Sequence, residues 1–439
     1  MDPITRLVFP KTAMFDDAGL WLGGCAVADL AARYGTPLYV YDAATMNAAA
    51  ATYSNALRES YPGEWQVAYA AKAWLSTATA RWADRQGLGL DVVSGGELAI
   101  ALRAGFPADR IHFHGNNKTP AELAQALAAD IGSIVVDHPG ELALVDELAR
   151  GQGRRQAIWL RINPDVDVDT HGHTRTGHAT SKFGLSLTDG TAEAVARQAL
   201  DLDGVHLAGL HCHVGSQFRE ASPLVLAVER LLALAARLFA HTGWLPEDLS
   251  PGGGWAVPYH PDQVKGLTPV EAYVPLVAQA VVDGCRAHGL PLPRLVLEPG
   301  RSLVARAGVA IYTVGAVKQA GSATYVFVDG GLADNPRPAL YDARYTALLA
   351  NRHADGPLTQ VSVAGPYCET GDILIHDLEL PPMRPGDLLA VPAGGAYQLS
   401  MSNNYNAARR PAVVWVENGQ ARLIQRRETV DDLLARDVG

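Results

Sequence analysis

The sequence predicts an α/β protein that contains a closed (β/α)8 barrel of parallel strands and a C-terminal antiparallel β domain. Three observations support this fold class. Short apolar runs alternate with Ala-rich and Leu-rich segments through the first two thirds of the 439 residues, polar residues gather where those runs end, and beyond about residue 305 the runs are separated by Pro and Gly turns. Eight β/α units in roughly 250 residues are typical of a barrel with its active site at the carboxyl ends of the strands.

The barrel strands are expected in short apolar runs that are bounded by turn or helix signals. These runs are residues 65–70, 88–93, 111–114, 133–137, 157–162, 205–213, 247–254 and 294–300. Between them, apolar residues recur every three or four positions and the segments often end at Gly, as in 96–105, 121–129 and 224–243. This periodicity predicts amphipathic helices.

A second set of runs predicts the strands of the β domain. They are residues 309–321, 324–331, 359–367, 387–397 and 409–424. The stretch before Tyr41 also contains strand-like pieces, and we expect it to pack with this domain. The predicted boundaries are therefore an N-terminal segment at 1–40, the barrel at 41–304 and the β domain at 305–439.

Composition excludes several classes of function. With 48% hydrophobic and 19% charged residues the chain resembles a globular enzyme, and its net charge of −10 without a basic block argues against nucleic-acid or anionic-membrane binding. No stretch has the length and apolarity of a membrane span or a secretion signal, so we expect a cytoplasmic protein. Cys25, Cys212, Cys285 and Cys368 are far apart in sequence, which indicates neither a disulfide framework nor a zinc site.

Lys72 lies among small and apolar residues in QVAYAAKAWLS (66–76), where the first predicted strand ends. A lone lysine there is usually just an exposed side chain, but other strand ends favour a functional role. The sixth, seventh and eighth strands end in HCHVGSQ (211–217), SPGGGW (250–255) and EPGR (298–301). Together these ends offer an aromatic ring, a glycine-rich anion cradle and a carboxylate beside a guanidinium.

Each of these parts meets a requirement of pyridoxal 5′-phosphate. The aldehyde needs a lysine for its Schiff base, and Lys72 is the candidate. The phosphate needs closely approaching backbone N–H groups, which glycines permit. The three glycines are Gly252, Gly253 and Gly254. Glu298 could keep the pyridine nitrogen protonated, and His213 could rest against the ring.

Paired histidines at a strand end also suit a metal-dependent hydrolase. His211 and His213 would then need further ligands, and His114 and Asp91 are of the right type. The histidine-rich stretch at 171–178 also looks metal-like, but it lies in a polar, turn-rich segment. We therefore predict no metal.

Eight motifs along the chain resemble those of diaminopimelate decarboxylases. In order they are YAAKAW, DVVSGGEL, HFHGNNK, SKFGL, HCHVGSQ, EPGR, GPYCETGD and MSNNYNAARRP. The resemblance runs from about Gly35 to Leu434, and the ordered set is far more specific than any one motif. It implies an alanine-racemase-type barrel with a β domain, and decarboxylation of meso-2,6-diaminopimelate to L-lysine and CO₂, the last step of lysine biosynthesis.

The resemblance also implies roles for individual residues. Expected cofactor contacts are Lys72, Asp91, His213, Ser216, Gly252, Gly253, Gly254, Glu298, Gly300, Arg301 and Tyr397. Expected catalytic residues are Lys72, Cys368 and His213. Expected substrate contacts are Arg301, Arg337, Tyr341, Glu369 and Tyr397. Cys368 and Glu369 are expected to reach the cofactor of a neighbouring subunit, which implies a homodimer with shared active sites.

Substrate choice depends on the chemistry of the far end of diaminopimelate, which carries an ammonium and a carboxylate. Glu369 fits the ammonium, and Arg301 and Arg337 fit the carboxylate because a guanidinium can bind it bidentately. A glutamate after Cys368 resembles the diaminopimelate type, whereas ornithine decarboxylases carry Asp there. A decarboxylase of ornithine, lysine, arginine or a modified amino acid of secondary metabolism remains the alternative, with a racemase or a non-catalytic relative behind it.

Overall fold

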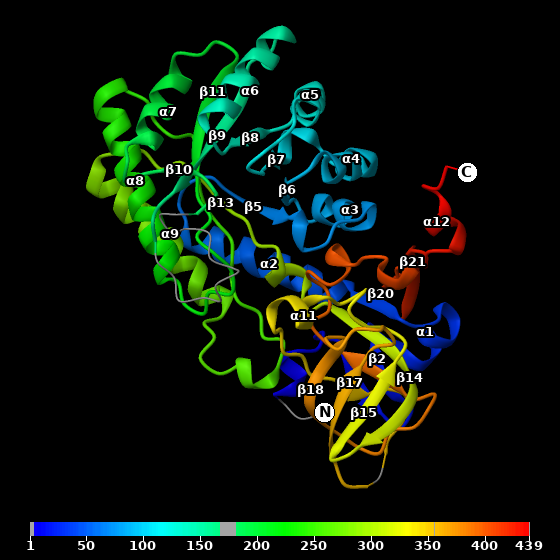
Figure 1. Ribbon diagram of the computed structural model, residues 1–439. Coiled ribbons are helices and arrows are strands. Elements are labelled where there is room, and N and C mark those ends of the chain that lie inside the picture. The colour runs from blue at the N-terminus through cyan, green and yellow to red at the C-terminus, as the bar shows by residue number, and fades with distance from the viewer. Residues whose placement is uncertain (1–3, 167–180, 355, 439) are drawn as a thin grey trace. The chain divides into compact units, whose positions relative to one another are not determined.

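The computed structural model describes residues 4–166, 181–354 and 356–438 (Figure 1). The chain divides into two compact units. One, the barrel unit, comprises Ala50–Ala256 and Leu267–Gly300. The other, the β unit, comprises Met1–Ala49, Val257–Gly266 and Arg301–Gly439.

The barrel unit contains a closed sheet of parallel strands. In sheet order these are β9 (Gln156–Asn163), β11 (Val205–His211), β12 (Asp248–Gly252), β13 (Arg294–Leu297), β5 (Trp65–Ala70), β6 (Gly89–Val92), β7 (Ile111–Phe113) and β8 (Ser133–Val136). The additional pairing of β8 with β9 closes the sheet, and the short β10 (Leu185–Ser186) pairs in parallel with the end of β9. The predicted barrel and its eight strands are confirmed.

Helices follow the strands and surround the sheet (Figure 1). They are α3 (Thr77–Arg85), α4 (Gly95–Ala104), α5 (Pro120–Ala128), α6 (Pro139–Gly151), α7 (Thr191–Leu200), α8 (Ser222–Thr242) and α9 (Val270–His288). Local sequence fixes several of their ends: Ser76 and Thr119 form capping boxes that satisfy free N–H groups, and Gly105 ends α4 in the left-handed conformation.

Side chains fill the barrel interior. Ala68, Val135, Trp159, Ala208 and Val296 form a buried cluster, in which small residues make room for one indole. The Trp159 indole N–H donates to Asp248 Oδ2 at 3.0 Å, so its polar atom is satisfied despite burial. Because the interior is packed, ligand chemistry is confined to the strand ends.

The β unit is built on a mostly antiparallel sheet. Its path runs β18 (Ile373–Leu380), β17 (Thr359–Ala364), β15 (Ala323–Val328), β14 (Gly308–Ala320), β4 (Leu38–Asp42), β20 (Ala412–Glu417) and β21 (Gln420–Gln425), with β19 (Leu388–Val391) pairing β14 and β16 (Leu348–Leu349). The pairs β15–β17 and β4–β20 are parallel, which is possible because long connections separate these strands in sequence. Since β4 lies between β14 and β20, the N-terminal segment joins this domain as predicted.

Smaller elements complete the β unit. They are β1 (Met14–Asp16), β2 (Gly19–Leu22), β3 (Cys25–Ala26), α1 (Val27–Tyr34), α10 (Arg301–Val304), α11 (Arg337–Tyr341) and α12 (Val430–Leu434). The helix α2 (Ala43–Ser60) leads from β4 toward the first barrel strand. A core of buried Val, Leu and Ile side chains joins β2 and α1 to the sheet, including Leu20, Leu30, Val40, Ile311 and Val414.

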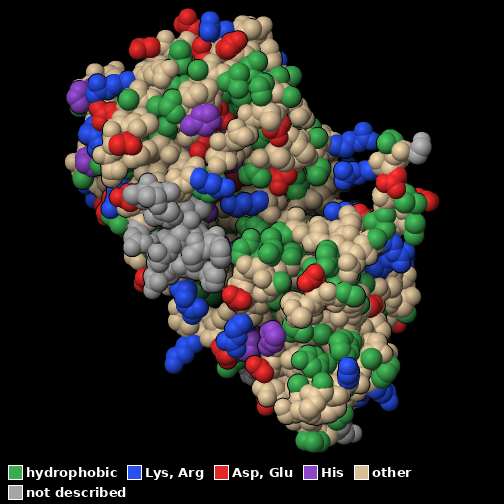
Figure 2. Space-filling view, in the orientation of Figure 1, with side chains coloured by type: hydrophobic (Ala, Val, Ile, Leu, Met, Phe, Trp, Pro, Cys, Tyr) green, Lys and Arg blue, Asp and Glu red, His purple; other side chains and the backbone are tan. Residues whose placement is uncertain are grey.

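The outer surface carries charges of both signs. On the face drawn in Figure 2, Asp and Glu side chains lie scattered among Lys and Arg side chains. Every helix in the described part of the chain is too short or too polar to cross a lipid bilayer.

A buried aspartate anchors the loop between β15 and α11. Asp334 Oδ2 accepts hydrogen bonds from the hydroxyls of Tyr39 (2.9 Å) and Tyr312 (2.7 Å), and its Oδ1 accepts from the Gly331 N–H (2.8 Å). Burial raises the pKa of Asp334 to about 6, although these hydrogen bonds oppose the shift. The loop is thereby tied to strands β4 and β14.

This raised pKa predicts a pH dependence of stability. The folded protein holds the Asp334 proton more tightly than the unfolded chain, so its contribution is complete below about pH 4 and is lost as pH rises through about 6. The Asp334→Asn variant should lack this pH-dependent contribution to the free energy of unfolding. The difference in free energy of unfolding between variant and wild type should change by about 1.4 kcal/mol between about pH 5 and pH 7. Denaturant unfolding across this range measures it, and parallel curves would contradict the assignment.

Candidate active site

Lys72 lies directly after β5, in the short helix η2 (Ala71–Ala73), and its side chain is exposed. Burial raises the pKa of Asp91 and lowers that of His213, and the charge of Lys72 opposes the first shift and adds to the second, so the three side chains lie within electrostatic reach of one another. Asp91 belongs to β6 and His213 follows β11, so these residues come from three separate strand ends. The closed parallel sheet brings these three strand ends to the same rim of the barrel.

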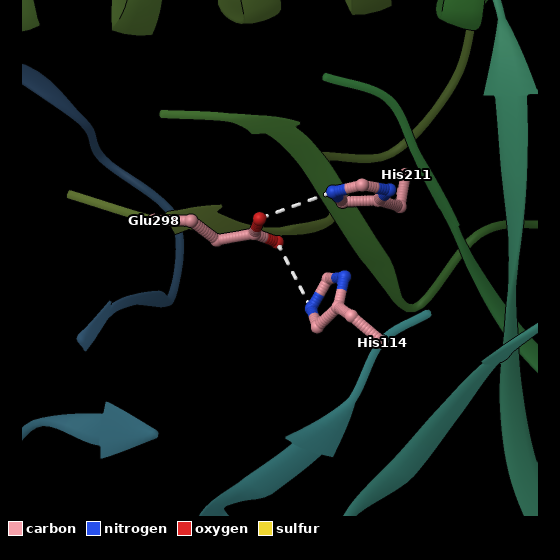
Figure 3. A group of neighbouring side chains, drawn as sticks. All are labelled: His114, His211 and Glu298. Carbon is pink, nitrogen blue, oxygen red and sulfur yellow. Dashed lines mark hydrogen bonds and ion pairs between the residues drawn. The ribbon is translucent and has the colours of Figure 1, made fainter. Parts of the chain in front are cut away.

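Glu298, which follows β13, lies at the centre of a buried polar group (Figure 3). Its Oε2 lies 3.0 Å from His211 Nε2, and its Oε1 accepts a hydrogen bond of 2.6 Å from the Ser250 hydroxyl. His114 Nε2 lies 3.9 Å from Oε1. Burial alone would raise the pKa of Glu298, but the electrostatic interaction with His211 and the hydrogen bonds from His211 and Ser250 outweigh burial and lower it. Glu298 is therefore a fixed buried anion.

The pKa of Asp91 is shifted in the opposite direction. Burial, with the nearby negative charge of Glu298, raises the pKa of Asp91 well above its ordinary range. Neither carboxyl oxygen of Asp91 has a hydrogen-bond partner among the described residues, and His114 Nε2 lies 3.7 Å from Oδ1. Burial also lowers the pKa of His114, which keeps that ring neutral. Two neighbouring carboxyl groups with pKa values driven apart are typical of a catalytic or cofactor site.

The glycines after β12 permit close backbone approach. A Cβ on Gly253 would lie 2.0 Å from the Glu298 carbonyl oxygen, and a Cβ on Gly254 would lie 2.3 Å from the Gly215 carbonyl oxygen. Gly252 and Gly254 also have positive φ angles of 79° and 114°. The Gly253 N–H points to His213 Nδ1 at 3.4 Å, so the cradle and the predicted ring-stacking histidine are neighbours.

Two other predicted contacts lie close by in the barrel unit. Ser216 is half-buried in the segment that follows β11. A Cβ on Gly300 would approach Ala70 Cβ to 3.0 Å, so this glycine lets the turn after Glu298 pack against the end of β5. With orphaned carboxyl oxygens on Asp91 and a glycine cradle beside a buried anion, the barrel residues fit a group that carries both a phosphate and a basic ring nitrogen.

The same residues offer a metal-like arrangement. One ligand atom from each of His114, His211 and Glu298 lies within 4.8 Å of the others, and His213 is not part of this group. Both oxygens of Glu298 are already engaged, by His211 and Ser250. The stretch at 171–178 lies outside the described residues. The two histidines of the HxH pair therefore have different partners. His211 binds the Glu298 carboxylate, and His213 lies beside the glycines.

In the β unit, two buried guanidiniums are surrounded by aromatic rings. Arg301 and Arg337 are 9% and 7% exposed. Arg337 donates to the Tyr345 hydroxyl at 2.6 Å, and its Cζ lies 4.4 Å from the centre of the Tyr259 ring. Arg301 donates to the Tyr259 hydroxyl and lies 4.5 Å over the Tyr397 ring. Within the described residues, no carboxylate lies at ion-pair distance from Arg337, so this cluster can accept an anionic group.

Tyr259 is a member of this cluster that sequence reasoning missed. Burial alone would raise the pKa of its phenol, but the charges of Arg301 and Arg337 outweigh burial and lower it. By contrast, burial raises the pKa of Tyr61 and Tyr273. Nothing in the local sequence around Tyr259 signals this role, because both arginines approach it from distant parts of the chain.

The remaining predicted residues also lie in the β unit. Cys368 and Glu369 are exposed, and Glu369 Oε1 accepts a hydrogen bond from the Tyr405 hydroxyl. Tyr341 is half-buried at the end of α11, the helix that begins at Arg337. Tyr397 has a φ of 61°, a left-handed conformation that is costly for an aromatic residue. Such strain is often found at functional sites.

In the barrel, Ser250 and His114 are the contributions that sequence analysis missed or misread. Ser250 was passed over as the start of the glycine run, yet its hydroxyl binds Glu298 and also accepts from the Gly252 N–H at 3.1 Å. His114 was considered only as a metal ligand, whereas it lies between Asp91 and Glu298. Their positions at strand ends are the only signal that could have indicated them.

Comparison with known proteins identifies close relatives. A family model described as "Pyridoxal-dependent decarboxylase, pyridoxal binding domain" matches residues 45–305. The diaminopimelate decarboxylase of Bacillus subtilis (strain 168) is 46% identical over 420 residues, which cover 95% of each chain. The crystal structure of diaminopimelate decarboxylase from M. jannaschii in co-complex with L-lysine has a TM-score of 0.92 at 35% identity, covering 98% of each chain. The Helicobacter pylori enzyme, complexed with L-lysine, gives a TM-score of 0.85 at 29% identity over 93% of this chain and 98% of that one.

The lowered pKa of Tyr259 can be measured. In a near-ultraviolet titration of the folded protein, one phenol should ionise below the ordinary tyrosine pKa of about 10, and the Tyr259→Phe variant should lack that step. Tyr61→Phe is the matched control, since it removes a phenol with a raised pKa and should leave the early step in place. An early step that persists in Tyr259→Phe would refute the arrangement of the two arginines around it.

Proposed function

The chain belongs to the diaminopimelate decarboxylase family of pyridoxal-dependent decarboxylases, and from this membership we propose that it converts meso-2,6-diaminopimelate to L-lysine and CO₂, the last step of lysine biosynthesis. The observation that carries the proposal is the buried anionic Glu298 at a barrel strand end, in the same unit as Lys72. Loss of CO₂ from an amino acid requires an electron sink, and a fixed carboxylate beside a ring nitrogen maintains one.

Pyridoxal 5′-phosphate is the cofactor of this family, and the barrel residues fit it. When bound, its protonated ring accepts the electron pair that CO₂ leaves behind. Lys72 holds its aldehyde end, the Gly252–Gly254 backbone and Ser216 hold its phosphate, and His213 supports its ring face. Arg301 and Tyr397 complete the proposed set of contacts.

Glu298 and Asp91 have different proposed roles, one as an anion and the other as a hydrogen-bond donor. The Glu298 carboxylate would keep a proton on the ring nitrogen of a bound cofactor, because His211 and Ser250 prevent the carboxylate from turning away. Asp91 keeps its own proton and can donate a hydrogen bond from an oxygen that has no partner among the described residues. His114 stays neutral between them and adds no competing charge.

Substrate recognition is assigned to the aromatic and arginine cluster of the β unit. Arg337, supported by Tyr259 and Tyr345, binds the distal carboxylate bidentately, with Arg301 and Tyr341 as further contacts. Glu369 binds the distal ammonium. A cation buried without a carboxylate partner favours substrates that bring one and disfavours those that lack it.

We further propose that the enzyme acts as a cytoplasmic homodimer in which Cys368 and Glu369 serve the site of the neighbouring subunit. The four cysteines are free thiols, which suits a reducing compartment. Cys368 is exposed, and it delivers or positions the proton that replaces CO₂ at Cα. The boundaries 1–40, 41–304 and 305–439 remain our proposal for the domains.

Borohydride reduction tests the assignment of Lys72. Reduction of the holoenzyme should fix the cofactor on the peptide that contains Lys72, and Lys72→Ala should lower turnover by about three orders of magnitude or more. The exposed Lys318 offers a control, since Lys318→Ala should leave the labelled peptide and the activity unchanged. Labelling of any other lysine would show that the proposed site is wrong.

Substrate competition tests the assignment of diaminopimelate. The enzyme should prefer meso-diaminopimelate over L-lysine by at least a few thousandfold in kcat/KM, on the order of 5 kcal/mol, because L-lysine lacks the distal carboxylate that Arg337 is proposed to bind. Arg337→Ala should narrow this ratio by weakening the diaminopimelate reaction.

The exposed Arg344 provides the matched control, and Arg344→Ala should preserve the ratio. CO₂ release is measured from meso-diaminopimelate, L-lysine, L-ornithine and L-arginine. Comparable rates on lysine or ornithine would overturn the substrate while leaving a pyridoxal-dependent decarboxylase. No turnover of any of the four by correctly loaded enzyme would point to a modified amino acid.

A further inference from the structure

A buried aspartate lies four residues beyond Cys368 and joins two loops of the β unit. Asp372 is 3% exposed. Its Oδ1 accepts a hydrogen bond from the Leu332 N–H at 2.7 Å, and its Oδ2 accepts from the Tyr367 N–H at 2.8 Å. Tyr367 immediately precedes Cys368, whereas Leu332 belongs to the loop that leads to Arg337. One carboxylate therefore binds the backbone of both loops.

The backbone of Asp372 closes the first of these loops on itself. Its N–H donates to the Glu369 carbonyl oxygen at 3.1 Å, and its own carbonyl oxygen accepts from the Gly365 N–H at 3.0 Å. The segment that contains Cys368 and Glu369 is thus a closed turn with Asp372 at its base. Both residues are exposed, so their positions depend on this base.

Two glycines give the carboxylate its place. A Cβ on Gly331 would lie 2.4 Å from Asp372 Oδ1, and a Cβ on Gly365 would lie 2.3 Å from Oδ2. Neither glycine has a positive φ angle, so backbone conformation does not require glycine at these positions. Glycine is required there because any side chain would occupy the space of the Asp372 carboxylate. The two loops are therefore built around an anion at this point.

The second loop is itself fixed. Asp334 binds it to Tyr39 and Tyr312 in strands β4 and β14, at a site separate from Asp372. The loop then enters α11 at Arg337. Asp372 thereby connects the Cys368 turn to a loop that is anchored on the sheet and carries the guanidinium assigned to the distal carboxylate.

We propose that Asp372 is a positioning residue for the reaction, which fixes Cys368 and Glu369 for the neighbouring subunit's site by clamping their turn to a loop that is anchored on the sheet. The inference rests on the proposed function. It makes the thiol that handles the proton and the carboxylate that binds the distal ammonium parts of one rigid group. A shift of about 1 Å in such a group can cost about a hundredfold in rate.

The Asp372→Asn variant tests the clamp with the smallest change in shape. An amide has only one oxygen, so one of the two N–H donors would face an NH₂ group instead of an acceptor. The control is Asp387→Asn. Asp387 is also buried in the β unit and binds Arg352 and the Arg384 N–H, which belong to neither loop. The Asp387→Asn variant therefore measures the effect of losing a buried aspartate that is not part of the clamp.

The first measurement does not need activity. Cys368 is exposed and the other three cysteines are buried, so iodoacetamide should alkylate Cys368 selectively in the folded holoenzyme. Labelling of Cys368 in Asp372→Asn should change by about tenfold relative to wild type, because the turn has lost its base. Asp387→Asn should label at the wild-type rate. Equal labelling of all three proteins would overturn the clamp, even if the wild type proved to act on another amino acid.

The second measurement uses the shared sites. Asp372→Asn alone should lower kcat by about a hundredfold and raise KM for diaminopimelate, with normal cofactor content. Mixed and re-equilibrated with Lys72→Ala, it should recover about a quarter of wild-type activity, since half of randomly formed dimers would contain one fully native site. Cys368→Ala mixed with Lys72→Ala is the positive control.

Recovery with Cys368→Ala but not with Asp372→Asn would overturn the positioning role. If neither mixture recovers despite proven subunit exchange, the shared site in the proposed function fails, and the labelling result alone decides the clamp. If Asp372→Asn does not fold, Gly331→Ala replaces it, because its Cβ would displace the same carboxylate while keeping its charge. That variant should show the same change in labelling, and wild-type labelling would overturn the inference.

Discussion

The arrangement of the barrel depends on one buried negative charge. Glu298 remains anionic because His211 and Ser250 bind its two oxygens, even though burial by itself would favour the protonated form. Burial, together with that charge, raises the pKa of Asp91 well above its ordinary range. Removing either support of Glu298 would leave an oxygen of a buried charge without its hydrogen-bond donor.

The polar groups around Glu298 lie close together because the parallel barrel strands all end at the same rim. β5, β6, β11, β12 and β13 each deliver one polar element there, and the packed interior around Trp159 holds their register. The glycines after β12 allow the backbone to pass within van der Waals contact of the Glu298 and Gly215 carbonyls. The same glycines therefore serve packing as well as the approach of a phosphate, which explains why a run of three is needed.

In the β unit, the organising constraint is the burial of positive charge. Arg301 and Arg337 are stabilised by phenol oxygens and aromatic faces, an arrangement that satisfies a guanidinium while leaving it able to bind an anion. Buried aspartates in the neighbouring loops act on backbone N–H groups instead, and so fix the loops without neutralising the arginines. The arginines are thus assigned to substrate recognition, whereas the aspartates hold the loops in place.

The sequence by itself determined the class of fold, the eight barrel strands and the candidates Lys72, His213, Glu298 and Arg337, because apolar periodicity and motifs at strand ends are local properties. The parallel pairing of β4 with β20 and of β15 with β17 could not be predicted from the sequence, since pairing between distant segments leaves no local pattern. Tertiary structure alone decided that Ser250 and His211 hold Glu298, that the pKa of Asp91 is raised, and that Tyr259 joins two arginines. These are consequences of burial and of charges brought together from far along the chain, and both arise only when the chain is folded.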